Sequence, residues 1–378
     1  MRRAWHLVTG EYPPRSGGVG DYTALLAAAM AREGVDAHVW APADARHDDG
    51  VTVHDVGAFD RAGLAAIDRG LEAYLAPRTI LIQYVPHAFG RKGANLAFCR
   101  WALRRRQQHG DDVRVMFHEP FFPFGWQRPQ RNALAAVNRA MAALLLRAAR
   151  RAYVSTPAWE TLLRPWAPRS LGPMEWLPIP STIPTVDDPD AVAALRARLT
   201  GGDPSRRVVG HFGTYGGMIA PLLEPALLAI LAPPSRSIAV LLGGGGPEFA
   251  ARLEAIDPQL RGRIVAPGYQ SPDDVSLHLQ ACDVVAQPYP DGASARRTSL
   301  MAALANGVAT VTTRGRFTEQ LWDDGPVPTV VAGDGALLAA EVLALLGDDA
   351  RRRAVAADGR AFYARHFSMR RTLDVLLD

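Results

Sequence analysis

The sequence has few of the residues that would mark a disulfide-stabilised, zinc-binding or nucleic-acid-binding protein. Its two cysteines, Cys99 and Cys282, are far apart and lie in apolar stretches, so we expect buried free thiols and no zinc site. Lys92 is the only lysine, and apart from the histidines all the other basic residues are arginines. The sequence has neither a lysine-rich tail nor a basic stripe with interleaved aromatic residues, so it gives no indication of a nucleic-acid partner.

Long apolar runs are also missing. No stretch reaches the roughly 18 apolar residues that a membrane-spanning helix needs, and the N-terminus lacks the features of a secretory signal. With 48% hydrophobic and 21% charged residues, the composition is typical of a globular chain. We therefore expect a cytoplasmic protein.

A length of 378 residues suits two domains of roughly 150 to 200 residues each.

The pattern along the chain indicates two doubly wound α/β domains. Short β-branched runs alternate with segments of helical period, which is typical of parallel sheets with crossover helices. The first half predicts helices at 21–32 and 132–150, and strands near 5–8, 37–40, 79–83, 114–117 and 152–155. The second half predicts strands near 208–212, 238–242, 264–266, 284–287 and 309–312.

A proline-rich stretch separates the two series of strands. Closely spaced prolines over 178–189 block regular helix and central strand, so this stretch is the expected linker. Beyond residue 347 the pattern predicts helix to the end of the chain, as two consecutive helices.

The stretch "EYPPRSGGVGDY" follows the first predicted strand and precedes a helix. Its glycines Gly17 and Gly18 could bring backbone amides close to an anion at the helix N-terminus, where the helix dipole also favours negative charge. A tight turn capped by Asp21 is the alternative. The spacing of the glycines does not match the G-x-G-x-x-G pattern of dinucleotide-binding domains, which argues against a dehydrogenase.

Three loops in the second half follow predicted strands and therefore converge on one sheet edge. They contain "GHFGTYGG" (210–217), "LLGGGGPEF" (241–249) and "QPYPDGASARRTSLMAALANGVATVTT" (287–313). In the third, Arg296 and Arg297 precede Thr298 and Ser299 at the start of a predicted helix. Guanidinium groups, hydroxyls and free amides together form a suitable diphosphate site. The alternative is a surface arginine pair followed by an ordinary N-cap.

Polar residues also follow two predicted strands of the first half. "QYVPHAFG" contributes Tyr84 and His87, and "MFHEPFFPF" contributes His118 and Glu119. A single histidine after a strand is often a satisfied structural residue. The adjacent Glu119 and three phenylalanines suit a shaped pocket, so both interpretations of His118 stay open.

Taken in order, these segments resemble glycosyltransferase family 4, the retaining nucleotide-sugar transferases of GT-B fold. The resemblance begins with "EYPPRSGGVGDYTALLAAAMAREGVDAHVWAP". It continues with "VVGHFGTYGGMIAPLLEPALLAI", "VLLGGGGPEFAARL" and "IVAPGYQSPDDVSLHLQACDVVAQPY", and it ends with "TSLMAALANGVATVTT". It implies an acceptor domain over 1–182 with a C-terminal helix at 367–378, and a donor domain over 183–366. It also implies catalysis without a metal or other cofactor, since the nucleoside diphosphate sugar is a co-substrate.

Two departures from the family pattern affect the expected donor site. Ser294 and Ala302 stand where the family usually has a pair of glutamates, so ribose contact by Ala302 is not expected. The loop 210–217 also lacks the usual arginine and lysine. We therefore expect Arg296 and Arg297 to supply the positive charge for the diphosphate. The Asp188-Pro189-Asp190 sequence is interpreted as the start of a helix and not as a metal motif.

The resemblance implies front-face departure of the nucleoside diphosphate. On the charge argument above, Arg296 and Arg297 would neutralise the leaving group, and His118 would contact the donor sugar. Asp291 is expected to hold sugar hydroxyls, and Tyr269 or Gln270 to lie near the base. The remaining expected donor-binding residues are Gly17, Gly18, Gly213, Thr214, Ser294, Thr298 and Ser299. The expected acceptor-binding residues are Tyr84, His87 and Glu119.

Other functions remain open at this stage. A GT-B sugar-nucleotide epimerase would use the same nucleotide site, and a non-catalytic binding or scaffolding protein would fit the missing glutamates. The acceptor is expected to be a small molecule, a glycan or a lipid-linked acceptor. Arg-rich predicted helices at 98–110 and 138–153 are compatible with peripheral contact at the inner membrane surface, and equally with ordinary surface helices.

Overall fold

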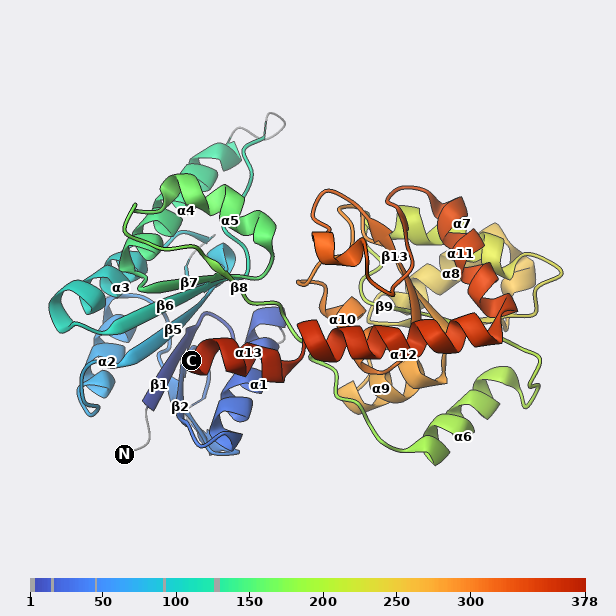
Figure 1. Cartoon of the computed structure of the whole chain (residues 1–378), viewed down its shortest axis with the longest axis horizontal. Coiled ribbons are helices and arrows are strands. Elements are labelled where there is room, and N and C mark those ends of the chain that lie inside the picture. The colour runs from blue at the N-terminus through green and yellow to red at the C-terminus, as the bar shows by residue number, and fades with distance from the viewer. Residues whose placement is uncertain (1–3, 15–16, 45, 91–92, 126–129) are drawn as a thin grey trace. The chain divides into compact units, whose positions relative to one another are not determined.

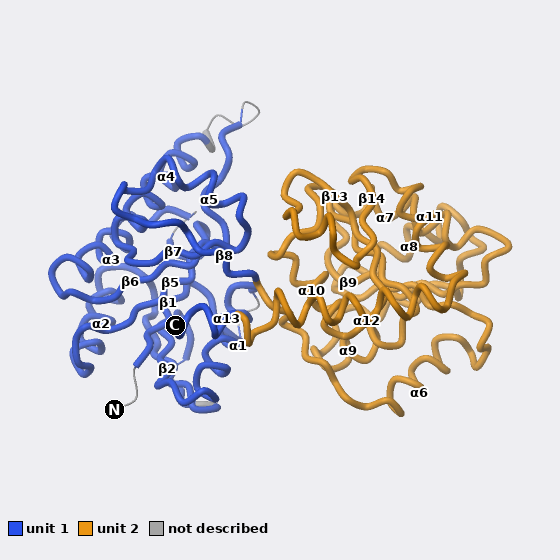
Figure 2. The backbone as a smooth tube through the Cα atoms, viewed as in Figure 1, with its two compact units in different colours: residues 1–178, 372–378 blue, residues 179–371 orange. Residues whose placement is uncertain are grey.

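The computed structural model describes residues 4–14, 17–44, 46–90, 93–125 and 130–378. The chain divides into two compact units, shown in Figure 2. Unit 1 comprises residues 1–178 and 372–378, and unit 2 comprises residues 179–371. Each unit has its own sheet and its own buried core, so each is considered by itself.

Unit 1 is built on an eight-stranded sheet in the order β3-β4-β2-β1-β5-β6-β7-β8. All neighbouring strands are parallel except β3 and β4. The residues 80–82 of a central strand are fully buried, as expected where helices cover both faces of a parallel sheet (Figure 1). The strands are β1 (Ala4–Thr9), β2 (Asp36–Ala41), β3 (Arg46–Asp48), β4 (Val51–Asp55), β5 (Thr79–Tyr84), β6 (Asp112–Phe117), β7 (Arg151–Val154) and β8 (Glu175–Trp176).

The helices of unit 1 connect these strands in the expected crossover pattern. Capping side chains set two of the helix starts: Asp60 accepts from the amides of Ala62 and Gly63, and Asn95 accepts from Phe98. The α-helices are α1 (Gly18–Arg32), α2 (Arg61–Leu71), α3 (Leu96–His109), α4 (Gln130–Ala148) and α5 (Pro157–Leu163), and the 3-10 helices are η1 (Pro86–Ala88) and η3 (Arg164–Trp166).

Unit 2 is built on a six-stranded parallel sheet in the order β11-β10-β9-β12-β13-β14. Its strands are β9 (Val208–Phe212), β10 (Ile238–Leu242), β11 (Ile264–Gly268), β12 (Val284–Gln287), β13 (Ala309–Arg314) and β14 (Thr329–Val331). Its helices are α6 (Pro189–Thr200), α7 (Ala220–Leu231), α8 (Gly246–Ile256), α9 (Pro272–Ala281), α10 (Thr298–Ala305), α11 (Gly335–Gly347) and α12 (Asp349–His366), with 3-10 turns η4 (Pro258–Leu260) and η5 (Gln320–Trp322). The prediction of two doubly wound α/β domains is confirmed.

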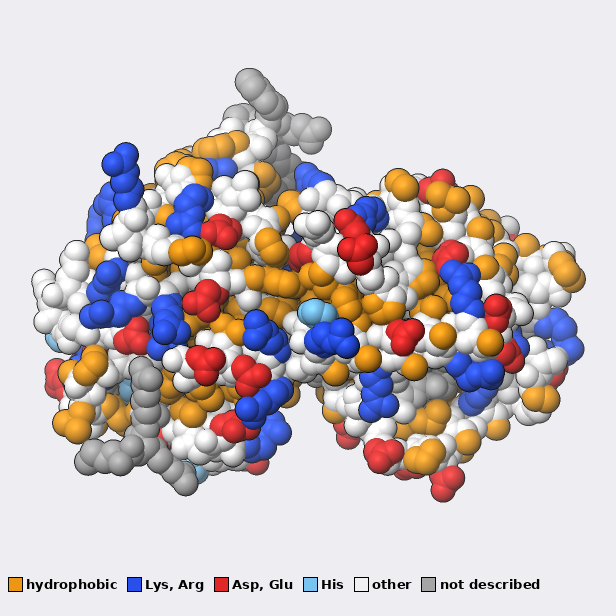
Figure 3. All heavy atoms as spheres, viewed as in Figure 1, with side chains coloured by type: hydrophobic (Ala, Val, Ile, Leu, Met, Phe, Trp, Pro, Cys, Tyr) orange, Lys and Arg blue, Asp and Glu red, His pale blue; other side chains and the backbone are white. Residues whose placement is uncertain are grey.

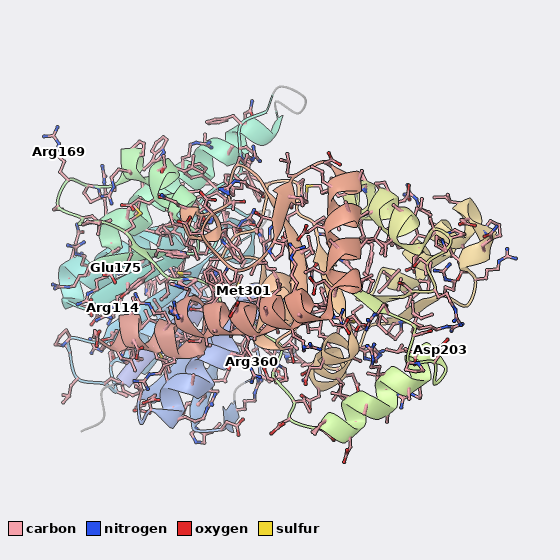
Figure 4. All side chains as sticks on the ribbon, turned by 45° about the vertical axis from the view of Figure 1, so that its right-hand side comes forward. Arg114, Arg169, Glu175, Asp203, Met301 and Arg360 are labelled. Carbon is pink, nitrogen blue, oxygen red and sulfur yellow. The ribbon has the colours of Figure 1, made fainter. Side chains whose placement is uncertain are left out.

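The end of the last helix, α13 (Met369–Leu377), belongs to unit 1. Its buried residues are Thr372, Leu373 and Leu376. The guanidinium of Arg114 on β6 donates to the carbonyl of Leu376 at 2.8 Å and lies over the ring of Trp5 (Figure 4). A cation at a helix C-terminus is electrostatically favourable, so this contact helps to hold α13 on unit 1.

One face of the unit 1 sheet carries a cluster of aromatic and histidine side chains. His6 on β1 lies opposite His38 on β2, and the Nε1 of Trp40 donates to the Nδ1 of His6 at 3.3 Å. The ring of His54 on β4 stacks on Trp40. Burial lowers the pKa of His6 to about 3, and burial also lowers the pKa of His54 to about 4.

This cluster predicts that acid destabilises unit 1. Because the folded pKa of His6 lies below the unfolded value near 6.5, the unfolded state binds more protons as the pH falls below that value. Because His6 stays neutral in the folded state, the free energy of unfolding should be about 2 kcal/mol lower at pH 5 than at pH 7. Urea unfolding of His6→Gln at the two pH values should show a smaller difference than the wild type. The exposed His47→Gln serves as the control, and an unchanged difference in His6→Gln would contradict the assignment.

Candidate active site

The sheet of unit 2 has a topological switch point between β9 and β12. The chain continues from β9 to β10 on one side, and β12 lies on the other. At the carboxyl end of β12, Gln287 donates through Nε2 to the carbonyl of Phe212 at 2.9 Å. A Cβ built on Gly213 would lie 3.6 Å from the Oγ of Ser299. The loop after β9 and the start of α10 therefore meet at the position where open α/β sheets bind ligands.

The loop after β10 joins them through closely packed glycine backbone. Gly213 donates from its amide to the carbonyl of Leu242 at 3.0 Å. Gly243 has φ of +127°, and a Cβ there would lie 2.2 Å from the carbonyl oxygen of Gly213. Only glycine fits this approach without strain. These contacts confirm that the loops after β9, β10 and β12 converge on one edge of the sheet.

Side chains from β13 and from the loop after it hold the loop between β12 and α10. The amide of Tyr289 donates to the Oγ1 of Thr313 at 2.7 Å, and the amide of Ala295 donates to the carboxylate of Glu319 at 3.0 Å. Glu319 is buried and also accepts from the Nε1 of Trp322 at 2.9 Å. The backbone that carries the arginine pair is thereby fixed before any ligand binds. Sequence reasoning missed Glu319, because nothing in the chain pattern links it to a loop 24 residues earlier.

Arg296 and Arg297 converge on one carboxylate, that of Asp291. The Nη2 of Arg296 lies 2.6 Å from Oδ2, and Arg297 pairs with Oδ1. Arg296 also lies over the ring of Phe317 and Arg297 over that of Tyr289. The three charged side chains are 14–22% exposed and carry a net charge of +1. Asp291, expected to hold sugar hydroxyls, is placed as the shared counter-ion of the two arginines.

Helix α10 begins at Thr298 beside this cluster. Arg297 is the N-cap residue, and it forms no side-chain capping bond. The hydroxyl of Tyr289 lies 2.8 Å from the Oγ of Ser299, and burial raises the pKa of Tyr289 to about 12, so this hydroxyl stays protonated at neutral pH. Tyr289 was not among the predicted site residues. In the sequence, its position two residues after the predicted strand 284–287 could have indicated it.

The remaining predicted donor residues differ in exposure. Ala302 is fully buried in the core of unit 2, so its side chain offers no exposed surface. Ser294 is fully buried, and its Oγ has no hydrogen-bond partner within the described chain. Tyr269 is 83% exposed after β11, whereas Gln270 donates to the carbonyl of Pro267 near the end of β11. Thr214 is exposed in the loop after β9.

In unit 1, the glycine run accommodates a carboxylate of the chain itself. Oε1 of Glu11 accepts from the amides of Val19 at 3.0 Å and Gly20 at 3.3 Å, in the first turn of α1. A Cβ on Gly17 would lie 2.5 Å from this carboxylate, whereas Gly18 is open. The backbone amides that follow Gly17 and Gly18 thus already bind a negative charge, that of Glu11. Whether these two glycines contact a diphosphate remains a prediction, and Glu11 was missed by sequence reasoning.

The two glycines should respond differently to the same substitution. Gly17→Ala should displace the Glu11 carboxylate and leave two helix amides without their acceptor, which costs about 1–2 kcal/mol. Gly18→Ala should change stability little, because its Cβ meets no atom within 4 Å. Urea unfolding of both variants tests this. Equal losses of unfolding free energy in the two variants would show that the Glu11 carboxylate is not the reason why position 17 needs glycine.

His118 lies just after β6 and is almost wholly buried, at 8% exposure. Its carbonyl accepts from the Oγ of Ser155 at 3.0 Å and from the Nε1 of Trp159 at 2.9 Å. Its Nε2 lies 2.8 Å from the Oε1 of Gln83. Burial lowers the pKa of His118 to about 3, so the imidazole is neutral at physiological pH. Both backbone and ring are therefore fixed.

The three predicted acceptor residues have different surroundings. Tyr84 is fully buried, with its ring against Phe89 and Phe117, and burial raises its pKa. His87 is exposed on η1, and Glu119 is half-buried next to His118. Of the three, His87 and Glu119 present side-chain surface to a ligand, and Tyr84 is a core residue of unit 1.

Acidic side chains in the described parts of the chain do not gather into a metal site: no group of three or more His, Cys, Asp or Glu residues there could hold an ion. Asp188 accepts from the amide of Ala191 at 2.9 Å and caps α6, which confirms its interpretation as a helix start. None of the helices within the described residues has the length and apolar character needed to cross a bilayer.

Several arginines of α3 are used inside unit 1. Arg105 is buried and donates through Nε to Asp111 at 2.8 Å, and Arg106 donates to the carbonyl of Ala149 at 2.6 Å. On the face of the molecule drawn in Figure 3, acidic and basic side chains are interspersed. These arginines therefore have structural partners that do not require a membrane.

Comparisons with known proteins agree with this architecture. Residues 211–348 match the family described as "Glycosyl transferases group 1". No curated protein sequence matches the chain. Among solved structures, sucrose-phosphate synthase from Thermosynechococcus elongatus has a TM-score of 0.71 at 17% identity, covering 99% of this chain and 97% of that one.

Two further structures are similar over almost their full length. HepE from Anabaena, solved with UDP and glucose, has a TM-score of 0.69 at 17% identity, covering 100% of this chain and 98% of that one. The UDP-forming α,α-trehalose-phosphate synthase from Burkholderia vietnamiensis has a TM-score of 0.65 at 14% identity, with 100% and 96% covered. Residues 211–348 are thus similar in sequence to the group 1 glycosyl transferases, and the chain as a whole has the GT-B fold.

Proposed function

We propose that the protein is a retaining glycosyltransferase that moves a hexose-type sugar from a nucleoside diphosphate sugar to an acceptor hydroxyl, without a metal ion. The observation that carries this proposal is the pair Arg296 and Arg297 beside the first turn of α10, at the switch point of unit 2. Two guanidinium groups and uncapped helix amides suit the charge of a departing diphosphate.

In this mechanism the protein positions the two substrates and supplies positive charge to the leaving diphosphate. Arg296 and Arg297 exchange part of their contact with Asp291 for phosphate oxygens, while Thr298 and Ser299 offer amides and hydroxyls. The negative charge that develops on the leaving phosphate is thereby stabilised by groups that are already in place. The phosphate takes the proton of the acceptor hydroxyl, and the new glycosidic bond forms on the same face of the sugar.

The comparisons support a nucleotide-sugar donor of the uridine type as the first to test. The similar proteins include one solved with UDP and glucose and a synthase named as UDP-forming. The family match covers the unit that contains Arg296 and Arg297. For the acceptor we propose a small molecule, a glycan or a lipid-linked acceptor that contacts His87 and Glu119 of unit 1. The reaction takes place in the cytoplasm, at the inner membrane surface where the acceptor is lipid-linked.

The proposal is tested by incubating the full chain with UDP- and GDP-hexoses, with and without EDTA. We expect slow hydrolysis of one donor, unaffected by EDTA, and transfer with retained anomeric configuration once an acceptor sugar is added. Both can be followed by proton NMR of the anomeric signal. Nucleotide binding without any turnover would support the scaffolding alternative, and formation of a new sugar nucleotide would support the epimerase alternative. Inversion at the anomeric carbon would overturn the retaining mechanism.

A further inference from the structure

Gln83 is a buried polar residue that sequence reasoning did not connect with any site. It lies near the carboxyl end of β5, and its side chain is fully buried. Strand β6 pairs in parallel with β5, with Gln83 opposite Met116, so His118 follows two residues beyond that partner. The register of the sheet therefore places the amide of Gln83 beside the imidazole of His118, with Oε1 at 2.8 Å from Nε2.

This hydrogen bond determines which nitrogen of His118 carries the proton. The oxygen of an amide can only accept a hydrogen bond, so the Nε2 of the imidazole must be the donor. The imidazole is neutral, because burial lowers its pKa to about 3. A neutral imidazole has a single N–H, so Nδ1 carries a lone pair and can accept a hydrogen bond. None of the described residues donates to this Nδ1.

Two other polar groups around His118 are buried without a partner among the residues that the structure describes. They are the Nε2 of Gln83 and the hydroxyl of Tyr22, whose ring meets that of His118 edge-on at 5.2 Å. Buried polar groups in proteins are rarely left unsatisfied, and those that are often mark a functional site. The lone pair of Nδ1 points away from the amide of Gln83, because the two nitrogens of an imidazole face in different directions. A hydroxyl group, such as that of a sugar, can donate a hydrogen bond to it.

We propose that Gln83 is a positioning residue: its amide oxygen holds His118 as the Nε2–H tautomer, so that Nδ1 accepts a hydrogen bond from a hydroxyl of the donor sugar. The part of this inference that concerns the sugar rests on the proposed function. The part that concerns the tautomer does not, because it follows from two side chains of unit 1 alone. If Gln83 were only a packing residue, replacing its amide would leave the tautomer unchanged.

The tautomer is measured directly on the full chain. We use protein labelled with 15N-histidine and a long-range proton–nitrogen correlation spectrum between pH 6 and 8, assigning the His118 signals with His118→Asn. The wild type should show the pattern of the Nε2–H tautomer. Gln83→Leu removes the acceptor and should give a mixture of tautomers, whereas Gln83→Glu keeps an acceptor oxygen and should retain the Nε2–H form.

Matched controls keep this test falsifiable. Gln108→Leu changes an exposed glutamine on α3 and should leave the His118 signals as in the wild type. Gln83→Met, of similar length, replaces Gln83→Leu if the latter does not fold. An Nδ1–H tautomer in the wild type, or an unchanged tautomer in the folded variant that lacks the amide, would overturn the assignment.

A second measurement tests the link to the sugar. With UDP-glucose as the probe, Gln83→Leu should lower kcat for hydrolysis or transfer about tenfold or more, while the affinity for UDP stays within twofold of wild type. Gln83→Glu should recover most of the rate. Equal loss of UDP affinity and of rate would contradict the sugar contact. If the wild type turns over no nucleotide sugar, the proposed function fails, yet the tautomer result still decides the role of Gln83 beside His118.

Discussion

Arg297→Ala should lower the affinity for UDP roughly 30-fold and abolish measurable sugar transfer. The substitution removes charge-assisted hydrogen bonds to a diphosphate, which contribute about 2 kcal/mol to binding. It also removes a charge that stabilises the leaving group, so kcat should fall together with affinity. Calorimetry with UDP, combined with initial rates of donor hydrolysis, measures the two effects separately.

The control for this prediction is Arg261→Ala, an exposed arginine of unit 2 between η4 and β11. It should leave both affinity and rate unchanged. Arg297→Lys is informative as well, because it keeps the charge but loses the planar pair of donors, and its effect should be intermediate. The ion pair with Asp291 offers a purely structural alternative. In that case Arg297→Ala would lower the melting temperature, while each folded molecule would bind UDP as the wild type does.

Gly243→Ala should disrupt the donor loops of unit 2 by geometry alone. The added methyl group would lie 2.2 Å from the carbonyl oxygen of Gly213, and the residue would keep a φ of +127° that alanine rarely adopts. We expect a loss of about 3 kcal/mol in the free energy of unfolding of unit 2. If the loops move apart to relieve the contact, UDP binding should be lost even where the sheet remains folded. Urea unfolding and calorimetry test both effects.

Gly244→Ala is the matched control, since a Cβ at the neighbouring glycine meets no atom within 4 Å. It should cost well under 1 kcal/mol and leave UDP affinity intact. Similar losses in the two variants would mean that flexibility of the whole glycine run matters, and not the close approach of Gly243 to Gly213. Unchanged UDP binding in Gly243→Ala would show that this loop is not part of the donor site.

The strands around the switch point of unit 2 could be predicted from the sequence. The predicted strands 238–242 and 284–287 coincide with β10 and β12, because short, fully buried strands of parallel sheets are continuous apolar runs. The strands β3, β4, β8 and β14 were not predicted. Of these, β3, β8 and β14 have two or three residues each and lie at sheet edges, where pairing with a neighbour decides the conformation and little apolar signal is needed. Strand β4 has five residues and lies next to the edge strand β3.

The predicted site was more accurate about loops than about individual contacts. That the loop of Gly213 lies beside Ser299 follows from the order of strands along the chain, and the structure agrees. Glu11 was overlooked for a different reason. No pattern in the sequence pairs Glu11 with the helix start, yet its carboxylate accepts hydrogen bonds from the amides that follow the glycines. A contact of this kind depends on the direction in which the loop returns, which local residue preferences do not encode.

The sequence by itself determined the class of fold, the division into two α/β domains and the loops that carry glycines and arginines. These features follow from local periodicity and from the backbone freedom of particular residue types. Only the tertiary structure decided which groups are partners: Asp291 with the two arginines, Glu11 with the first turn of α1, and Gln83 with His118. The physical reason is that such pairs depend on strand register and loop packing, which bring together side chains that lie apart in the chain.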